Sequence, residues 1–219
     1  MNMFKLTMVI AITILLAALI MISQVPADLQ LPIHWNSAGV VDKYANAHTA
    51  LLFPPAVTIA LIAVIFLLRF FEPRKENLSQ SKKAVYSITF AISLLLGTLE
   101  LGYIAIICGA EINMQLLVVF MVGISLMIIG NFLSKTKSNY FIGIRTPWAL
   151  QNDENWRKTH RLSGRLFMIT GFIVGTACWI IRTEHLTFLI VGLVLPSAIA
   201  PSIYSWWLWK KNESNVSEE

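Results

Sequence analysis

Charged residues are scarce in this chain of 219 residues, because Asp, Glu, Lys and Arg together make up only 13% of it. A soluble domain carries about a quarter charged residues. Hydrophobic residues account for 56% of the chain, and the mean hydropathy is +0.67. This balance excludes an ordinary soluble domain and indicates a chain that lies in a membrane.

Motifs that mark enzymes and metal sites are also lacking. The sequence contains no HExxH, no P-loop, no GxSxG and no cysteine cluster. His34 and His48 do not have a spacing typical of metal ligands. The only cysteines, Cys108 and Cys178, lie near the same ends of two apolar segments, so a disulfide is conceivable, although packing is the expected role. We therefore expect no catalysis, no bound metal and no cofactor.

Long apolar runs are what the chain has in abundance. A membrane helix needs about 20 mostly apolar residues. Six segments qualify, at approximately 6–23, 50–71, 85–108, 114–133, 164–182 and 186–209. The first exceeds the apolar region of a signal peptide, so we interpret it as a retained helix. The sequence predicts an all-α polytopic membrane protein with six transmembrane helices, and no internal repeat supports an inverted-repeat transporter.

The positions of Lys and Arg predict the orientation of these helices. All of them except Lys43 and Arg182 fall on one side of the six segments. Because positive charge accumulates in cytoplasmic loops, we expect this side, with both termini, to be cytoplasmic. The aromatic cluster at 204–209, just before two lysines, is typical of a membrane interface. The same asymmetry explains the net charge of +5, so the lipid bilayer is the expected partner and no nucleic acid is needed.

Two long loops divide the chain into parts. We expect an N-terminal helical hairpin at 1–72 with an external loop at 24–49. A four-helix region at 73–211 follows, with a cytoplasmic loop at 134–165. The short polar end, 212–219, is predicted to be disordered.

The external loop reads LPIHWNSAGVVDKYANAH in its central part, where turn-forming residues are mixed with aromatic and apolar ones. Two interpretations remain open: an ordered cap on the helix ends, or a docking surface for a molecule outside the cell. The candidate binding residues are His34, Trp35, Asn36, Gly39 and Asp42.

The cytoplasmic loop contains NYFIGIRTPWALQNDENWRKTHRLSGR. Thr146 and Pro147 suit a helix start, and a second start is expected near Asn152 or Asp153. Beyond it, a basic stripe at helical spacing is typical of an anchor at the lipid head groups and consists of Arg157, Arg161 and Arg165. Arg145 is flanked by apolar residues and should find a carboxylate, a carbonyl or an aromatic face. Whether it fixes the fold or binds a partner is left open by the sequence.

Two features inside the apolar segments carry further hypotheses. Gly171 and Gly175 form a GxxxG motif, which suits close helix contact within the bundle or in a homodimer. Glu100 is the one acid well inside a segment and should face the interior of the bundle. It is either a protonated residue that ties helices together or a proton or substrate site. In the second case the protein would be a small proton-coupled transporter or exporter.

The two loops together resemble a known family. The signature of the SdpI family is a Gly-Asn pair at the end of one helix, an N-x-x-x-G-[IL]-R-T-P-W stretch, a later Trp and a glycine-rich membrane helix. The chain resembles it at Gly130 and in the matching residues Asn131, Asn139, Gly143, Arg145, Thr146, Pro147, Trp148 and Trp156. The external loop is similar to an N-terminal domain of uncharacterised function that is often joined to it. The resemblance implies a bacterial cell-membrane protein that confers immunity to a secreted toxic peptide of sporulation-delaying type. It also implies that the protein can sequester a cytoplasmic transcriptional repressor. On this basis we expect the external loop to bind the peptide and the cytoplasmic loop at 134–165 to bind the repressor.

Overall fold

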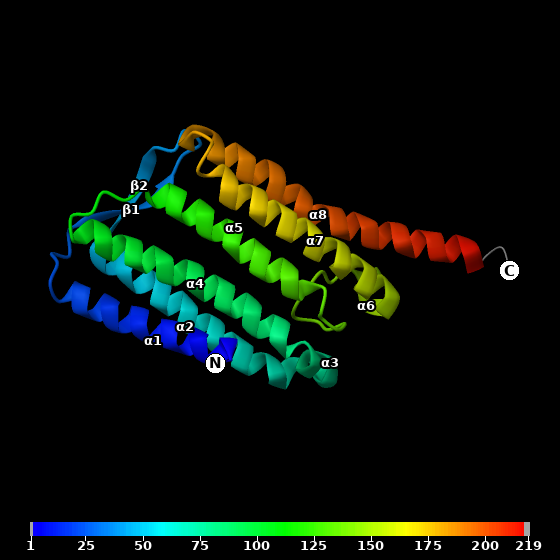
Figure 1. The fold of residues 1–219 in the computed structure, drawn as a ribbon. Helices are drawn as coiled ribbons and strands as arrows, with labels where there is room; N and C mark the ends of the chain where they lie inside the picture. Colours follow the sequence, from blue (N-terminus) through cyan, green and yellow to red (C-terminus); the bar gives the residue numbers. More distant parts are fainter. Residues whose placement is uncertain (1, 217–219) are drawn as a thin grey trace.

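The computed structural model describes residues 2–216, and helices dominate it (Figure 1). Within this range six long helices lie side by side: α1 (Met3–Ile22), α2 (Ala47–Phe71), α4 (Lys82–Ile107), α5 (Met114–Leu133), α7 (Asp153–Ala177) and α8 (Thr183–Val216). Two short helices lie at one end of the bundle, α3 (Lys75–Gln80) and α6 (Pro147–Gln151). All six predicted segments therefore fall on long helices.

Five of the described helices are long and apolar enough to cross a membrane, namely α1, α2, α4, α5 and α8. Helix α7 has the right length but carries charged residues over its first half, as the sequence DENWRKTHRLSGR shows. It begins at Asp153, where the sequence predicted a helix start, because the side chain of Asn152 caps it; the apolar segment predicted from 164 onward begins only in its later part. The helical, multi-pass class is thus confirmed, while a sixth crossing by α7 stays a prediction.

The packing order follows the chain closely. Helices α1 and α2 pack on α4, α4 packs on α5, α5 on α7, and α7 on α8. The contact between α5 and α7 rests on glycines: a Cβ on Gly123 would lie 2.7 Å from the carbonyl oxygen of Gly171 and from the nitrogen of Gly175. A Cβ on Gly130 would lie 2.7 Å from the carbonyl oxygen of Gly164. Only residues without side chains let two backbones approach so closely. The GxxxG motif of α7 is therefore used within the chain, and its face is not free for a homodimer.

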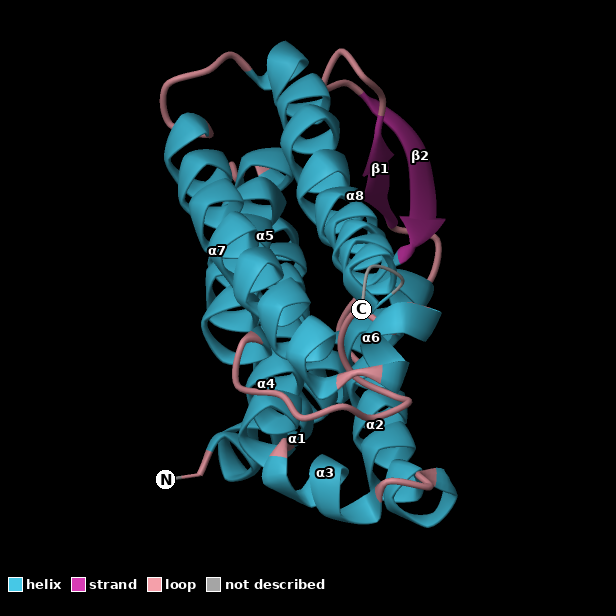
Figure 2. Cartoon of the chain, turned by 90° about the vertical axis from the view of Figure 1, so that its right-hand side faces the viewer, coloured by secondary structure: helices cyan, strands magenta, loops and turns pink. Residues whose placement is uncertain are grey.

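The external loop contains a β-hairpin, so the all-α prediction was wrong at this point. Strands β1 (Gln30–Trp35) and β2 (Val41–Asn46) pair antiparallel, with Gln30 opposite Asn46 and Trp35 opposite Val41 (magenta in Figure 2). The turn explains the pairing: Gly39 adopts φ +78°, and the side chain of Asn36 accepts hydrogen bonds from two backbone N–H groups.

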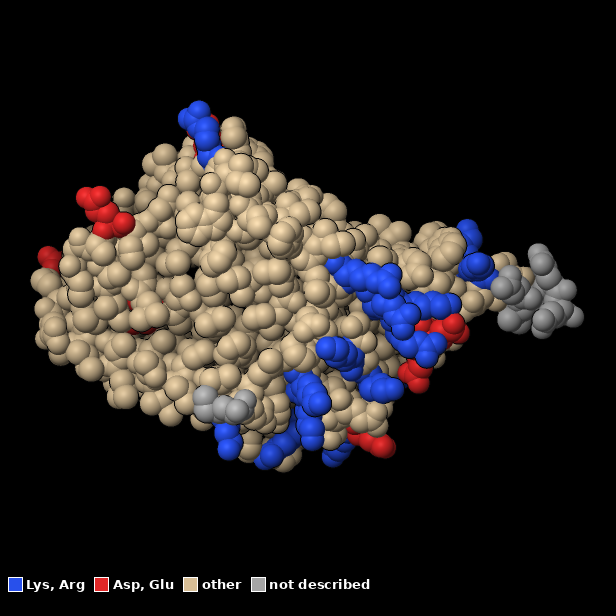
Figure 3. Space-filling model, viewed as in Figure 1, with Lys and Arg blue, Asp and Glu red and all other residues tan. Residues whose placement is uncertain are grey.

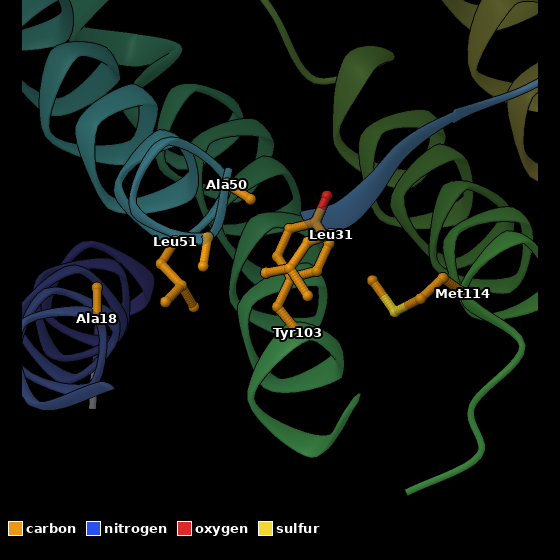
Figure 4. Packing of buried hydrophobic residues seen from close by; sticks show 7 residues of the cluster. Ala18, Leu31, Ala50, Leu51, Tyr103 and Met114 are labelled. Carbon is orange, nitrogen blue, oxygen red and sulfur yellow. The ribbon is translucent and has the colours of Figure 1, made fainter. Parts of the chain in front are cut away.

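A buried cluster fixes this hairpin on the helix ends (Figure 4). Leu31 of β1 is 1% exposed and lies among Leu51, Tyr103 and Met114. The hydroxyl of Tyr103 donates a hydrogen bond to the carbonyl oxygen of Pro32 at 3.0 Å. Burying a leucine side chain stabilises a fold by about 1.5–3 kcal/mol. The hairpin is thus an ordered cap, one of the two roles left open by the sequence.

The tip of the hairpin reaches the other side of the bundle. A Cβ on Gly39 would lie 2.8 Å from the side-chain oxygen of Gln115, at the start of α5, and 3.5 Å from the carbonyl carbon of Thr183, at the start of α8. Gln115 also donates a hydrogen bond to the carbonyl oxygen of Thr183 at 3.4 Å. The hairpin therefore bridges the α1–α2 side and the α5–α8 side of the molecule.

The C-terminal end differs from the prediction. Helix α8 continues to Val216, so residues 212–216, which were expected to be disordered, are helical. The remaining part of the predicted tail, 217–219, lies outside the described residues. Cys108 and Cys178 are both free and form no disulfide with each other.

Candidate functional sites at the two ends of the bundle

One end of the bundle carries nearly all the positive charge (Figure 3). This end, the basic end, holds α3, α6, the starts of α1, α4 and α7, and the ends of α2, α5 and α8. The opposite end, the hairpin end, holds β1 and β2 together with Lys43 and Arg182, the two cations that the sequence placed there. The two predicted loops thus form two separate sites.

The basic end is organised around the motif loop, residues 134–146, which joins α5 to α6. Asn139 is 0% exposed, and the loop folds around its side chain. Its Oδ1 accepts hydrogen bonds from the backbone N–H groups of Phe141 at 3.0 Å and Ile142 at 2.8 Å. Its Nδ2 donates to the carbonyl oxygen of Lys137 at 2.8 Å. An amide side chain supplies both the acceptor and the donor that this turn needs.

A buried histidine holds the next turn of the motif loop. Gly143 adopts φ +107°, and a Cβ there would collide with the ring of His160 on α7. The backbone N–H of Ile144 donates to Nε2 of His160 at 2.9 Å, and Nδ1 lies 2.8 Å from the carbonyl oxygen of Trp156. Since an N–H can only donate and a carbonyl can only accept, His160 is neutral with its proton on Nδ1. Burial lowers its pKa to about 4.

Trp156 completes this group. Its ring stacks on that of His160 with centroids 3.9 Å apart, and its indole N–H donates to the carbonyl oxygen of Thr136 at 3.0 Å. The sequence pointed to Trp156 as a signature residue but missed His160, although the two stand one helical turn apart. That spacing, on a helix predicted to start near Asn152, was the signal that could have found it.

A second segment, 72–81, clamps the motif loop from the side of α2 and α4. Glu72 is buried; its two carboxylate oxygens accept from the backbone N–H groups of Arg74 at 2.8 Å and Tyr140 at 3.0 Å. The guanidinium of Arg74 donates to the hydroxyl of Ser138 and, at 2.9 Å, to the carbonyl oxygen of Leu150. Except for the local bond between Arg74 and Glu72, these bonds join residues more than sixty positions apart, so the early half of the chain holds the signature loop in place.

Two further bonds strengthen the clamp. Asn77 donates from Nδ2 to the carbonyl oxygen of Ser138 at 2.8 Å, and the hydroxyl of Ser81 accepts from the backbone N–H of Lys137 at 2.8 Å. Sequence reasoning missed this clamp. The available signal was the polar run EPRKEN directly after the apolar segment that ends at 71.

Helix α8 holds the far side of the motif loop. The hydroxyls of Thr146 and Ser205 lie 2.6 Å apart, and Asn155 exchanges two bonds of 2.8 Å with Ser205, one to its carbonyl oxygen and one from its hydroxyl. Thr146 also caps α6, and Pro147 is its first residue, as predicted. The rings of Trp148 and Trp209 lie 5.8 Å apart. The loop is therefore fixed by α2–α4, α7 and α8 together.

Few signature residues remain exposed at the basic end. Arg145 is exposed and donates from Nη1 to the carbonyl oxygen of Tyr140 at 2.9 Å, so it finds one of the three partners expected for it. Asn131 is also exposed, on α5. The stripe formed by Arg157, Arg161 and Arg165 faces outward along α7. These groups are available to a partner, whereas Asn139, Gly143 and Trp156 build the loop.

At the hairpin end, the five candidate residues come together on β1, β2 and the turn between them. Nδ1 of His34 lies 2.5 Å from a carboxylate oxygen of Asp42, and both side chains are exposed. The hydrogen bond from His34 lowers the pKa of Asp42. Asn36 and Gly39 shape the turn, and Trp35 packs against the buried cluster. Of the five candidate residues, only His34 and Asp42 are therefore exposed.

Exposed apolar side chains surround that pair. Ile33, Val40 and Tyr44 all lie on the strands or at the turn and are exposed. A polar pair set in an apolar surface can hold an amphipathic molecule by hydrogen bonds and by burial of apolar area at once.

Glu100 is the polar residue that stands apart from both ends. It is 0% exposed on α4, and within the described range neither of its carboxylate oxygens has a hydrogen-bond partner. Gly97, nearly one turn earlier, packs against Ile10 and Ile14 of α1. This face of α4 therefore looks toward α1, and Glu100 lies inside the bundle.

These features define a multi-pass helical membrane protein with an ordered cap at one end and a hydrogen-bonded loop at the other. The profile of the SdpI/YfhL protein family matches residues 135–205, which hold most of the motif loop, α6, α7 and much of α8. Immunity protein SdpI of Bacillus subtilis (strain 168) is 27% identical to the chain over 199 residues, which cover 90% of each protein. No solved structure matches the chain significantly. Residues 135–205 thus carry the SdpI/YfhL family pattern, the chain is similar to an immunity protein of that family along most of its length, and it is a multi-pass protein of the bacterial cell membrane.

Proposed function

We propose that this protein protects the cell that makes it against a secreted antimicrobial peptide. The observation that carries this function is the similarity to an immunity protein along 90% of both chains, rather than over one motif only. With 90% of the chain aligned, the motif loop and the clamp segment 72–81 fall within the span that the two proteins share. A binding function needs no catalytic group, in keeping with the absence of enzyme motifs from the sequence.

Orientation assigns a role to each end of the bundle. The positive-inside rule places the basic end in the cytoplasm, with six crossings including α7, and the hairpin end outside the cell. The peptide would then meet the outer surface around His34, Asp42, Ile33 and Tyr44. The N-terminal part, 1–72, supplies that surface, and the part at 73–211 supplies the motif loop.

A challenge with the peptide tests this function. A sensitive bacterium producing the chain should survive a peptide of sporulation-delaying type, and replacing both His34 and Asp42 by Ala should abolish survival. Lys43→Ala is the matched control, because Lys43 is exposed on the same strand next to Asp42. Membrane levels are equalised by immunoblot. Absence of protection by the wild type would refute the immunity function, and equal protection by all variants would refute the outer docking surface.

A role in signalling is the second part of the proposal. The basic stripe of α7 and the exposed Arg145 would hold an acidic surface of a cytoplasmic repressor while the outer end is occupied by peptide. Arg145→Ala, with Lys211→Ala as the control cation on α8, should lower recovery of such a repressor in the membrane fraction. Protection that survives this loss would separate immunity from signalling, whereas unchanged recovery would refute the docking role of Arg145.

One observation favours an alternative function. Glu100 is buried without a hydrogen-bond partner in the described part of the chain, as expected of a proton site in a transporter. Glu100→Gln keeps the size of the side chain and removes its charge. It should abolish resistance if the protein exports the peptide by proton coupling, and it should spare resistance if the protein binds the peptide.

A further inference from the structure

A groove lies at the basic end on the side away from the motif loop. It has a volume of about 470 Å³ and is formed by the start of α1, the end of α2, α3 and the start of α4. Three cations line it, Arg69, Lys75 and Lys82, and no acid does. In the described part of the chain, no carboxylate lies within 4.0 Å of the nitrogens of these three side chains. Their charges are thus uncompensated by the protein and favour an anion.

The floor of the groove is apolar and aromatic. Phe4 of α1 and Tyr86 of α4 both line it, with ring centroids 5.0 Å apart. The guanidinium of Arg69 lies over the ring of Phe66, 3.8 Å from its centroid. Phe66 is itself exposed on a helix that spans the membrane, so the groove opens toward hydrocarbon. A soluble anion would gain nothing from such a floor, whereas acyl chains would bury apolar area there.

We propose that this groove binds one anionic glycerophospholipid from the leaflet at the basic end, with its phosphate among Arg69, Lys75 and Lys82 and its acyl chains along Phe4 and Phe66. Basic pockets between helices at a membrane surface have the chemistry that such head groups require. The lipid site is independent of the immunity function and requires only that the helices lie in a bilayer.

A lipid in the groove would also affect the motif loop, because one chain segment contacts both. Segment 72–82 has two faces: Lys75, Ser79 and Lys82 line the groove, while Arg74 and Asn77 hold the motif loop on the opposite face. Within α3, Lys75 and Ser79 stand one helical turn apart and line the groove, while Asn77 between them bonds to the motif loop. A lipid in the groove would therefore hold the clamp in position and stabilise the motif loop through it.

The experiment uses the full chain in detergent and follows thermal unfolding by tryptophan fluorescence. Phosphatidylglycerol should raise the unfolding midpoint of the wild type saturably, and phosphatidylcholine with the same acyl chains should do so far less. The triple variant Arg69→Gln, Lys75→Gln, Lys82→Gln should need on the order of a hundredfold more phosphatidylglycerol for the same shift, since each of the three surface cations contributes about fivefold to such attraction.

The matched control removes the two cations of another aromatic anchor. Lys210 and Lys211 lie over the rings of Trp206 and Trp207 at this end but do not line the groove. Lys210→Gln with Lys211→Gln should respond to phosphatidylglycerol as the wild type does. If both variants lost the response to phosphatidylglycerol equally, the lipid would be attracted to the basic surface in general, and the proposed site would be overturned. An equal shift with glycerol 3-phosphate would indicate a soluble anion instead of a lipid and also overturn it.

A measurement on a chain with intact cations covers the case in which the triple variant does not fold. Ser79 lines the groove and is exposed, so Ser79→Cys can carry a fluorophore in a chain whose two free cysteines are replaced by Ser. Phosphatidylglycerol with brominated acyl chains should quench it more strongly than brominated phosphatidylcholine at the same mole fraction. Equal quenching by the two lipids would refute the site.

Discussion

Acid should open the motif loop through His160, and the size of the effect follows from its surroundings. The ring is buried, accepts the N–H of Ile144 and donates to Trp156, an arrangement that only the neutral form can make. Protonation would set an N–H of the ring against the N–H of Ile144 and place a charge in a buried site.

The sign and magnitude follow from linkage. Burial lowers the pKa of His160 from 6.5 to about 4, so the open loop binds its proton before the closed one does. Stability is therefore complete above pH 6.5 and is lost as pH falls toward 4. Between pH 7.5 and 4.5 the loss is about 2.5 kcal/mol, or roughly 70-fold in the opening equilibrium.

Thermal unfolding in detergent, followed by tryptophan fluorescence between pH 7.5 and 4.5, measures this loss. The His160→Gln variant is the comparison, because the amide oxygen of Gln can accept from Ile144 and does not titrate. It should be less stable than the wild type at pH 7.5 but should depend less on pH. Parallel pH curves for the two proteins would refute the role of His160, since the other titrating groups are common to both.

Three further predictions concern packing and polar burial, each measured as an unfolding midpoint in detergent. Gly123→Leu should separate α5 from α7 and destabilise by about 1–3 kcal/mol or more, while Gly192→Ala, which meets no atom within 4 Å, should be neutral; equal effects would refute the close helix contact. Leu31→Ala should cost about 2–5 kcal/mol and expose the hairpin to protease, whereas Ile33→Ala on the exposed face should not. Glu72→Gln replaces one acceptor by a donor opposite a backbone N–H and should cost about 1–3 kcal/mol; an unchanged midpoint would contradict the clamp.

Local patterns predicted the parts of the fold that local physics determines. The apolar runs located the long helices, because about 20 apolar residues in a membrane must be helical to satisfy their backbone. The start of α6 followed from Thr146 and Pro147, and the start of α7 from Asn152. The GxxxG motif of α7 indicated close helix contact before any partner helix was known.

What the sequence did not predict depends on contacts between distant residues. The bond from Tyr140 to Glu72 joins positions 68 residues apart, and the bond from Arg74 to Leu150 joins positions 76 apart. No periodicity within a window reports such a pair. The hairpin was missed for a different reason. Its strands are short, and the turn-forming residues Asn36 and Gly39 between them did not by themselves indicate that the two strands pair.

The bridge formed by the hairpin bears on how the protein is made. Residues 30–46 leave the ribosome early, but the tip of the hairpin packs against Thr183, which follows some 140 residues later at the start of α8. At about 5–20 residues per second, that interval lasts on the order of ten seconds. Until α8 is inserted, the turn of the hairpin lacks its contact with Thr183 and stays exposed. Its closure would then mark the end of assembly, and chains truncated before α8 should keep an accessible hairpin and be recognised as unfinished.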